Sequence, residues 1–440
     1  LEGYNVDWTK KYKGNSRLVL KPNSTKKVSQ ILKYCNENLL PVVPQGGNTG
    51  LVGGAIPIKD EIILSLSNMN KILEFDTHQS VISCEAGCVL DALNQHLLPY
   101  KYEIPLDLGS RGSCQIGGNI ATNAGGIRFI KFGPFKSYVL GMEVVLANGE
   151  ILDLRSKIRK DNTGLDIKQS FIGSEGILGI ITQANILVSP LDKFKTVILM
   201  QCESFGKVLE ISRECKSTPG RHLSALEFFD EHCYKLVQKN LPGVVRPFEF
   251  SPELKNFYVL IELCGQEPLD GIIEELYEKL SEKNLTLNMI MSENESQFHS
   301  LWRLREGIAE ACGRGGIVLK YDVSLGIEKF EDIVQSVRKR HGDYGYSVGY
   351  GHIGDSNIHI NSICKKPEYK KKMEELLEPY IFEYLASVNG SISAEHGIGS
   401  MKPKYLHFSK NNLAIHYMHQ LKKVFDPNGI LNPNKVLISQ

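Results

Sequence analysis

The chain has 440 residues, of which 42% are hydrophobic and 23% are charged, enough for two or three domains with cores of their own. Its formal net charge is +1, so the composition gives no electrostatic basis for a nucleic-acid or anionic-membrane partner. No stretch approaches the roughly 18 apolar residues of a membrane-spanning helix. The ten cysteines form no C-x-x-C motif, which favours reduced thiols.

The first 190 residues are predicted to form short strands and helices. A strand ending in "RLVLKP" precedes a helix over 24–38, with Ser24 placed to cap it. Further strands are expected within 42–45, 61–67 and 80–87. The stretch "EVVLANGEILDL" predicts a hairpin in which Asn148-Gly149 supplies the positive φ angles of a tight turn.

Three glycine-rich loops interrupt these elements. They read "QGGNTGLVGG" after the strand at 42–45, "PLDLGSRGSCQIGGNIATNAGG" from Pro105, and "GSEGILGIIT" from Gly173. Consecutive glycines let backbone N–H groups converge on phosphate oxygens. The Lys-Ser/Thr ending of a Walker A loop is absent. Three such loops, with Asn119, Thr122 and Asn123 as side-chain donors, favour a dinucleotide cofactor over simple turns.

A second domain is predicted from about residue 191, with an α/β composition. Strands are expected at 194–204, 257–265 and 317–325, and on the last of these Lys320 and Asp322 share one face. Helices are predicted over 269–284, over 295–315 as one continuous helix, and over 367–390, where Gly390 ends the helix. The tail 425–440 returns to loop chemistry and is expected to rejoin the first domain.

The stretch "GYGHIGDSNIH" at 349–359 contains two overlapping motifs. Its glycines spell G-x-G-x-x-G, but turn formers and an alternating strand follow in place of a helix, which argues against dinucleotide binding. His352 and His359 would face opposite sides of one straight strand. A turn at "GDSN" lets both imidazoles face one point, as a metal site would require. For any random pair of histidines, two hydrogen-bonded side chains at a strand end would be the more frequent outcome.

A third candidate ligand, Glu395, lies in "SISAEHGIGS". Two histidines and one carboxylate are a recurrent catalytic metal set. His396, next to it, could then act as a general base. Asn361 lies two positions beyond His359 on the same strand face, and Arg305 with Lys320 would suit a dicarboxylate.

These motifs together, with "KDNTGLDIKQSFIGSEGILGIIT" and "DPNGILNPNK", resemble the D-2-hydroxyglutarate dehydrogenase family, within the vanillyl-alcohol-oxidase group of FAD-linked oxidoreductases, over essentially the whole chain. The resemblance implies an α+β fold: a two-subdomain FAD-binding domain at 1–190, an α/β substrate domain with an antiparallel sheet and a metal site at 191–424, and a C-terminal return at 425–440. It implies His352, His359 and Glu395 as ligands of a divalent metal, and zinc is the metal expected. It further implies His396 as the catalytic base and Arg305, Lys320 and Asn361 as substrate contacts. The FAD contacts that it implies are Pro44, Gly46, Gly47, Asn48, Thr49, Gly50, Gly53, Pro105, Asp107, Gly112, Ser113, Gly117, Gly118, Thr122, Asn123, Gly125, Glu175, Gly179, Ile181 and Asn432.

The resemblance also sets the expected reaction and its partners. The chain would oxidise D-2-hydroxyglutarate to 2-oxoglutarate with hydride transfer to non-covalent FAD, since the first glycine loop has no attachment histidine. Electron-transfer flavoprotein is the expected acceptor, a homodimer the expected assembly, and the mitochondrial matrix the expected compartment, with the cytoplasm as the alternative. The first residue is Leu1, so we expect a processed or trimmed form.

One departure from the family pattern bears on the substrate. Ala309 stands where the family has a threonine that helps to hold the distal carboxylate of the substrate. One donor is lost there, so a D-lactate or broader D-2-hydroxy acid dehydrogenase of the same group is the alternative. Two alternatives come from other classes of protein. One is a metal-dependent hydrolase, and the other is a protein with the FAD-binding fold that acts only as a binding module.

Overall fold

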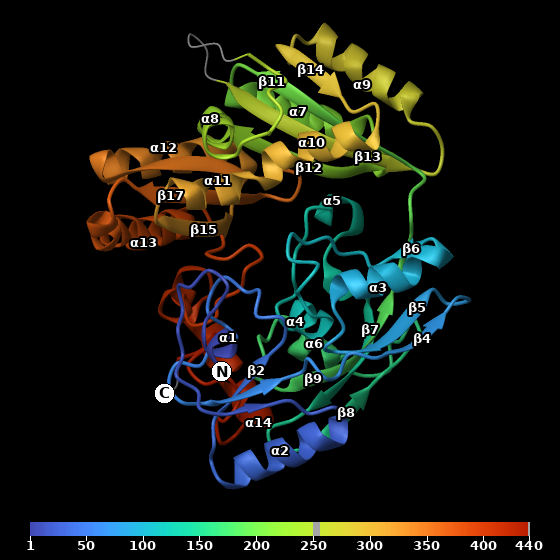
Figure 1. The fold of residues 1–440 in the computed structure, drawn as a ribbon, viewed down its shortest axis with the longest axis vertical. Helices are drawn as coiled ribbons and strands as arrows, with labels where there is room; N and C mark the ends of the chain where they lie inside the picture. The colour runs from blue at the N-terminus through green and yellow to red at the C-terminus, as the bar shows by residue number, and fades with distance from the viewer. Residues whose placement is uncertain (250–255, 439–440) are drawn as a thin grey trace. The chain divides into compact units, whose positions relative to one another are not determined.

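The computed structural model describes residues 1–249 and 256–438, and the fold separates into two compact units (Figure 1). Unit 1 comprises 1–126, 134–191 and 395–440, and unit 2 comprises 127–133 and 192–394. The predicted α+β class, with helices and antiparallel sheets, is confirmed. The chain returns to unit 1 at Glu395, earlier than position 425 where the sequence placed the return.

The first subdomain of unit 1 is built on a three-stranded parallel sheet in the order β1-β3-β2. β3 lies between β1 and β2 and pairs with both of them in parallel, and α2 connects β1 to β2 along the chain. The helix begins after Ser24, whose hydroxyl accepts a hydrogen bond from the N–H of Lys27 at 3.4 Å, as predicted. The bounds are β1 Val19–Leu20, α2 Thr25–Glu37, β2 Val42–Gln45 and β3 Ile62–Ser65.

The second subdomain holds a five-stranded antiparallel sheet in the order β4-β5-β9-β7-β8 and a separate pair, β10-β6. The predicted hairpin joins β7 to β8, but only Gly149 has a positive φ, +85°, and Asn148 does not. The bounds are β4 Ile72–Asp76, β5 Val81–Glu85, β6 Tyr102–Glu103, β7 Val139–Val145, β8 Ile151–Leu154, β9 Ile180–Leu187 and β10 Ser189–Pro190.

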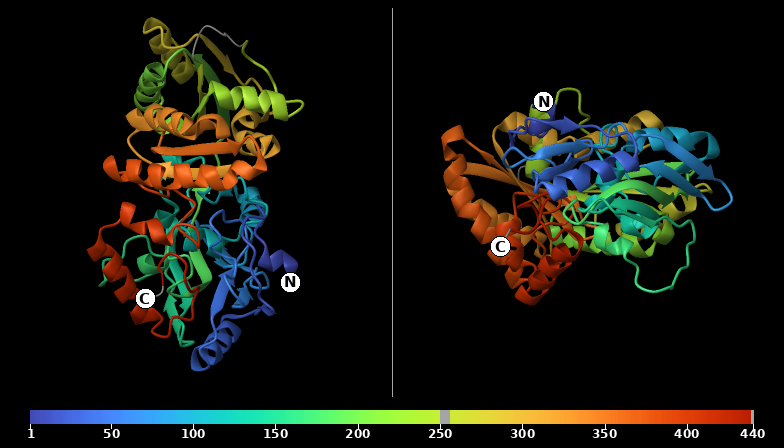
Figure 2. Two further views of the ribbon diagram at one scale, coloured as in Figure 1. Left: turned by 90° about the vertical axis from the view of Figure 1, so that its left-hand side faces the viewer. Right: turned by 90° about the horizontal axis from the view of Figure 1, so that it is seen from below.

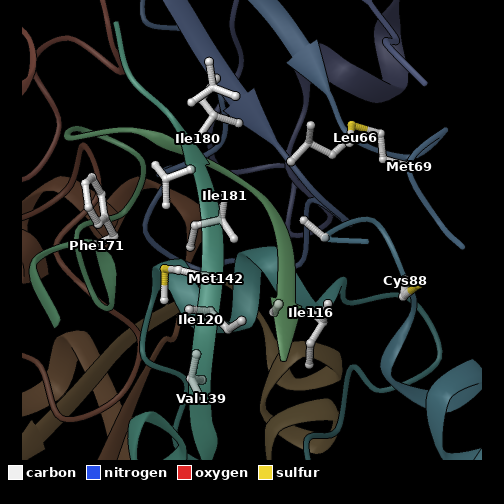
Figure 3. Close-up of a cluster of buried hydrophobic side chains, with 14 of the residues drawn as sticks. Leu66, Met69, Cys88, Ile116, Ile120, Val139, Met142, Phe171, Ile180 and Ile181 are labelled. Carbon is white, nitrogen blue, oxygen red and sulfur yellow. The ribbon is translucent and has the colours of Figure 1, made fainter. Parts of the chain in front are cut away.

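The core of unit 1 includes side chains of the five-stranded sheet and of α4 (Ile116–Ala121). Figure 3 shows Ile120 of this helix beside Met142 of β7 and Ile181 of β9. All three side chains are buried, so the sheet fixes the backbone of the second glycine loop, from which α4 begins. The other helices of unit 1 are α1 Glu2–Asn5, α3 Leu90–Leu97, α6 Lys168–Phe171 and α14 Asn412–Phe425.

Unit 2 is organised on one seven-stranded antiparallel sheet in the order β14-β11-β13-β12-β16-β17-β15. Its central strands are apolar runs, which is the pattern expected of strands covered on both faces. The bounds are β11 Phe194–Cys202, β12 Leu223–Asp230, β13 Phe257–Gly265, β14 Asn288–Met291, β15 Val318–Ser324, β16 Gly345–His352 and β17 Asn357–Cys364.

Helices cover both faces of this sheet. Because successive residues of a strand face opposite sides, Phe228 and Phe229 of β12 mark the two faces. Phe228 meets Phe205 of α7 and Phe330 of α12, with ring centroids 5.8 and 5.5 Å apart. Phe229 belongs to a core with α8, α10 and α11. Figure 2 shows α12 and α13 together in orange. The bounds are α5 Phe129–Phe132, α7 Phe205–Ser217, α8 Glu231–Asn240, α9 Asp270–Glu282, α10 Glu295–Glu306, α11 Ile308–Gly315, α12 Phe330–His341 and α13 Lys370–Ser387.

Two helix predictions for unit 2 need correction. The helix expected over 295–315 is divided at Gly307, where an added Cβ would lie 2.7 Å from the Arg303 carbonyl oxygen and from Leu241. Gly390 does not provide the left-handed residue after α13, because Asn389 takes that conformation with φ +54°. Gly390 is instead required by packing, since its Cβ would lie 2.8 Å from the Ser324 carbonyl oxygen. Among the described helices, none has the length and apolar content needed to cross a membrane.

Candidate active site and metal centre

The two histidines of the opening motif lie on a β-hairpin in unit 2. β16 ends at His352, β17 begins at Asn357, and the turn between them contains Ser356 with φ +68°. In the register of the hairpin, Tyr350 pairs with His359 and His352 pairs with Asn357. His352 and His359 therefore share one face of the sheet, diagonally across the two strands, and the predicted turn is confirmed.

The imidazoles of this pair face one another through their Nε2 atoms, which are 3.3 Å apart. Nδ1 of His352 lies 2.6 Å from a carboxylate oxygen of Glu227, and Nδ1 of His359 lies 3.7 Å from Asp322 Oδ1. The Glu227 carboxylate keeps the proton of His352 on Nδ1 and leaves a lone pair on its Nε2, whereas Asp322 is beyond hydrogen-bond distance of His359. Two facing Nε2 lone pairs would repel unless they shared a proton or a cation.

The spacing of the two nitrogens suits a metal ion. Two nitrogen ligands of a tetrahedral zinc, each about 2.0–2.1 Å from the ion, lie about 3.3 Å apart. Both histidines are buried, with 6% and 8% of their surface exposed, and both are backed by carboxylates. Metal-ligating histidines typically have such carboxylate partners. This part of the donor set therefore fits a divalent metal.

Two of the predicted substrate contacts lie on the same sheet, and the third, Arg305, lies on α10. Lys320 of β15 pairs in register with Asn361 of β17, whose amide donates to the Tyr350 hydroxyl at 2.9 Å. Burial lowers the pKa of Lys320. Arg305 of α10 is 7% exposed, and its guanidinium carbon lies 4.7 Å from the centre of the Tyr350 ring. These contacts join Arg305 to Asn361 through Tyr350.

Glu395 and His396 follow directly after Ala394, the last residue of unit 2, and belong to unit 1. Both are of residue types that can ligate a divalent metal, as are Asp322 and His359 of unit 2. In unit 1, an added Cβ at Gly125 would lie 3.1 Å from Glu395 Oε2, so this carboxylate packs on the second glycine loop. The loop after His396 is irregular, with φ +84° at Gly397 and +51° at Gly399. The sequence predicted this freedom at these two glycines.

Glu175 fixes that irregular loop from the third glycine loop. Its carboxylate accepts hydrogen bonds from the N–H groups of Ile398 and Gly399 at 2.7 and 2.8 Å. Burial raises its pKa, against the lowering effect of these bonds. Asn432 donates to the carbonyl oxygens of Glu175 and Gly54 at 2.8 and 3.0 Å. The carboxylate of one candidate FAD contact is thus committed to holding the Glu395–His396 segment.

The first two glycine loops contain glycines that packing does not explain. An added Cβ at Gly50, Gly112 or Gly118 would have no heavy atom within 4 Å, and none of the three has a left-handed φ. Glycine at such positions lets another molecule approach the backbone closely. Nearby, the buried side-chain oxygens of Gln115, Asn119 and Asn123 have no hydrogen-bond partner among the described residues. Open backbone beside unsatisfied acceptors fits a polar cofactor with hydroxyl and N–H donors.

Other candidate FAD contacts have packing roles of their own. An added Cβ at Gly47 would lie 2.0 Å from the Ser113 carbonyl oxygen, and one at Gly179 would lie 2.5 Å from Val144. Several others serve unit 1 as follows: Asn48 donates to the Val6 carbonyl, Thr49 accepts from Trp8, Thr122 donates to the Gly118 carbonyl, Asp107 pairs with Arg111, Gly53 approaches Ser400, Gly117 approaches Ala86, Pro44 approaches Gly176, and Ile181 is in the core. Their FAD assignments stay predictions.

Sequence reasoning missed Glu227 and did not assign Asp322 as a partner of His359. Glu227 lies in the apolar strand sequence "LSALEFFD" and is fully buried. A single carboxylate inside such a strand must have a charged or hydrogen-bonding partner, because an unpaired buried charge is costly. That signal identifies the residue as important, but its partner is 125 residues away in the chain.

Two protein families match the two parts of the chain. Residues 16–155 match a family described as FAD binding domain, and residues 191–436 match FAD linked oxidases, C-terminal domain. An alkyldihydroxyacetonephosphate synthase structure superposes with a TM-score of 0.73 at 17% identity, covering 97% of this chain and 77% of that one. These matches define an FAD-linked oxidase of the vanillyl-alcohol-oxidase fold.

Curated relatives identify the family of FAD-linked oxidases to which the chain is similar in sequence. The mitochondrial D-2-hydroxyglutarate dehydrogenase of Arabidopsis thaliana is 46% identical over 439 residues, which are 99% of this chain and 78% of that protein. A D-2-hydroxyglutarate–pyruvate transhydrogenase of Saccharomyces cerevisiae is 42% identical over 449 residues, covering 99% and 90%. The chain belongs to the D-2-hydroxyglutarate dehydrogenase family.

Proposed function

We propose that this protein oxidises D-2-hydroxyglutarate to 2-oxoglutarate with transfer of a hydride to FAD. The observation that carries the proposal is the polar group on β15, β16 and β17, in a chain that also has an FAD-binding domain. This group combines two buried imidazoles, whose Nε2 atoms lie 3.3 Å apart, with the cation Lys320, and Arg305 of α10 adds a second cation. A hydroxy acid with two carboxylates matches that donor set. The names of the relatives support the same substrate.

The residues of the chain have separable roles in this reaction. Arg305 and Lys320 bind the carboxylates, and Asn361 orients the bound acid. His396 accepts the proton of the C2 hydroxyl. The glycine loops would hold FAD without a covalent bond, and the flavin would supply the acceptor for the hydride of C2. His352, His359 and Glu395 would hold a divalent metal, with zinc as the first candidate, and the metal would supply Lewis acidity toward the C2 hydroxyl.

The wider setting follows from the relatives. The relative from Arabidopsis thaliana is named mitochondrial, so we place this chain in the mitochondrial matrix. A reduced flavin needs an acceptor, and we propose electron-transfer flavoprotein, with a homodimer as the assembly. The yeast relative is named for transfer to pyruvate, which makes a 2-oxo acid the alternative acceptor.

The proposed reaction has a direct spectroscopic test. Anaerobic mixing of the purified holoenzyme with D-2-hydroxyglutarate should bleach the flavin absorbance, and the L-enantiomer should not. D-Lactate should bleach it more slowly, since it offers no distal carboxylate to Arg305. Faster reduction by D-lactate would favour the alternative substrate, in agreement with the donor lost at Ala309. A protein that is yellow but unreactive with every D-2-hydroxy acid would contradict the proposal.

Arg305→Ala tests the recognition of the distal carboxylate. The loss of a desolvated, charge-assisted contact should weaken transition-state binding of D-2-hydroxyglutarate by about 2–5 kcal/mol, and kcat/KM for this substrate should fall accordingly. The substitution also leaves Glu227 without one of its cationic partners, so it should affect every substrate to some degree. The ratio of kcat/KM for D-2-hydroxyglutarate to that for D-lactate cancels this common effect. An unchanged ratio would show that Arg305 does not bind the distal carboxylate.

A further inference from the structure

Glu227 of β12 contacts both halves of the proposed site. One carboxylate oxygen, Oε1, lies 2.6 Å from Nδ1 of His352. The other, Oε2, accepts from Nε of Arg305 at 2.7 Å, and Nη2 of Arg305 lies 2.7 Å from the same oxygen. The residue is completely buried. One anion therefore joins a proposed metal ligand to a proposed substrate-binding cation.

Glu227 has a cationic partner on one oxygen and an imidazole on the other. The Arg305 guanidinium is always charged, so it pairs with the buried carboxylate as its counter-ion. Ionised, Glu227 has two oxygens with which to hold two donors at once. Nη2 of Arg305 is the buried terminal nitrogen that has no hydrogen-bond partner among the described residues, although it lies within ion-pair distance of Oε2. Glu227 thus orients the guanidinium and leaves it one amino group with which to bind a carboxylate.

We propose that Glu227 is a positioning residue that couples metal affinity to carboxylate recognition, an inference that rests on the proposed function. With Glu227 in place, the proton of His352 stays on Nδ1 and its Nε2 lone pair faces the metal position. The same carboxylate fixes the plane of the Arg305 guanidinium against Tyr350. A change at Glu227 should therefore disturb metal binding and substrate binding together.

Glu227→Gln tests whether the residue acts by holding His352 and Arg305 at the same time. A glutamine has one oxygen, so it can accept from His352 or from Arg305 but not from both as the carboxylate does. Loss of a carboxylate partner behind a metal-ligating histidine typically lowers metal affinity about 10–100-fold. We expect a loss of that size for zinc in the variant, and a higher KM for D-2-hydroxyglutarate. Glu227→Asp, which keeps the charge, should recover part of both.

Glu262 provides a matched control in the same unit. It is also fully buried, and its carboxylate binds Nε and Nη2 of Arg128 at 2.7 and 2.9 Å. Trp302 and Ser224 complete its partners at 3.0 and 2.8 Å. Glu262→Gln removes a buried, arginine-paired charge without touching His352 or Arg305. It should lower thermal stability while leaving zinc affinity and the substrate ratio unchanged.

The test is calorimetric titration of zinc into chelator-treated FAD-bound protein, combined with KM for D-2-hydroxyglutarate and for D-lactate. Weaker zinc binding and a higher KM for D-2-hydroxyglutarate in Glu227→Gln, with neither change in Glu262→Gln, would support the coupling. Wild-type zinc affinity in a folded Glu227→Gln or Glu227→Asp would overturn it while the proposed reaction stands. Equal losses in Glu262→Gln would also overturn it, as an effect of general destabilisation. A wild-type protein that binds no zinc would overturn the coupling and the metal assignment together.

Discussion

Chelation of divalent metal should abolish turnover of D-2-hydroxyglutarate while the flavin stays bound. The expected loss is large because Lewis-acid activation of a hydroxyl contributes several kcal/mol, on the order of 10²–10⁴-fold in rate. FAD should remain because its candidate contacts lie in the glycine loops of unit 1, whereas His352 and His359 lie on the sheet of unit 2. Steady-state rates, metal content and the flavin spectrum of one treated sample measure all three quantities. Full activity in metal-free protein would contradict the assignment.

Alanine variants test which histidines hold the metal. His352→Ala and His359→Ala should each lower zinc content and turnover, because each removes one of the two facing Nε2 atoms proposed as ligands. His341 is a suitable control, since it is a buried histidine of the same unit at the end of α12. His341→Ala should keep both zinc and turnover. Zinc retained in both site variants would place the metal elsewhere.

The local part of the site could be predicted from the sequence because the signals are local. The turn formers at 354–357 determine the hairpin, and the period of two along each strand determines which side chains share a face. The same period placed Lys320 and Asp322 together on β15. Where tertiary packing decides, the sequence did not suffice: the helix expected over 295–315 divides at Gly307, a position that packs too closely on Leu241 and the Arg303 carbonyl oxygen to hold a Cβ.

The carboxylates behind the site show why the remainder could not be predicted. Glu227 and Glu262 stand alone in apolar strands, which indicates burial and the need for a partner. Their partners come from an adjacent strand, from α10 and from the segment 127–133, and strand order decides which of them meet. Strand order is a property of the whole sheet, and it cannot be derived from the spacing of residues along the chain.

His396→Asn should retain zinc and FAD yet slow flavin reduction by on the order of 10²–10⁴-fold, the usual contribution of a positioned general base. The residue is partly buried, and its Nε2 lies 3.5 Å from Glu395 Oε1. Glu175 holds the next residues of the loop through Ile398 and Gly399, so the asparagine variant should keep the backbone in place. Stopped-flow reduction under anaerobic conditions measures the rate, and metal analysis of the same sample measures zinc. His407→Asn, in the same C-terminal segment, is the control and should behave as wild type.

The combination of these two measurements distinguishes the roles of the adjacent residues. Slow reduction with zinc retained assigns the proton transfer to His396 and leaves Glu395 as the ligand. Loss of zinc in His396→Asn would instead make His396 a ligand, and Glu395 would become the candidate base, since both residue types could serve either role. Near-normal reduction with zinc retained would show that the hydroxyl proton leaves without a protein base. In that case the Lewis acidity of the metal would be sufficient to activate the substrate.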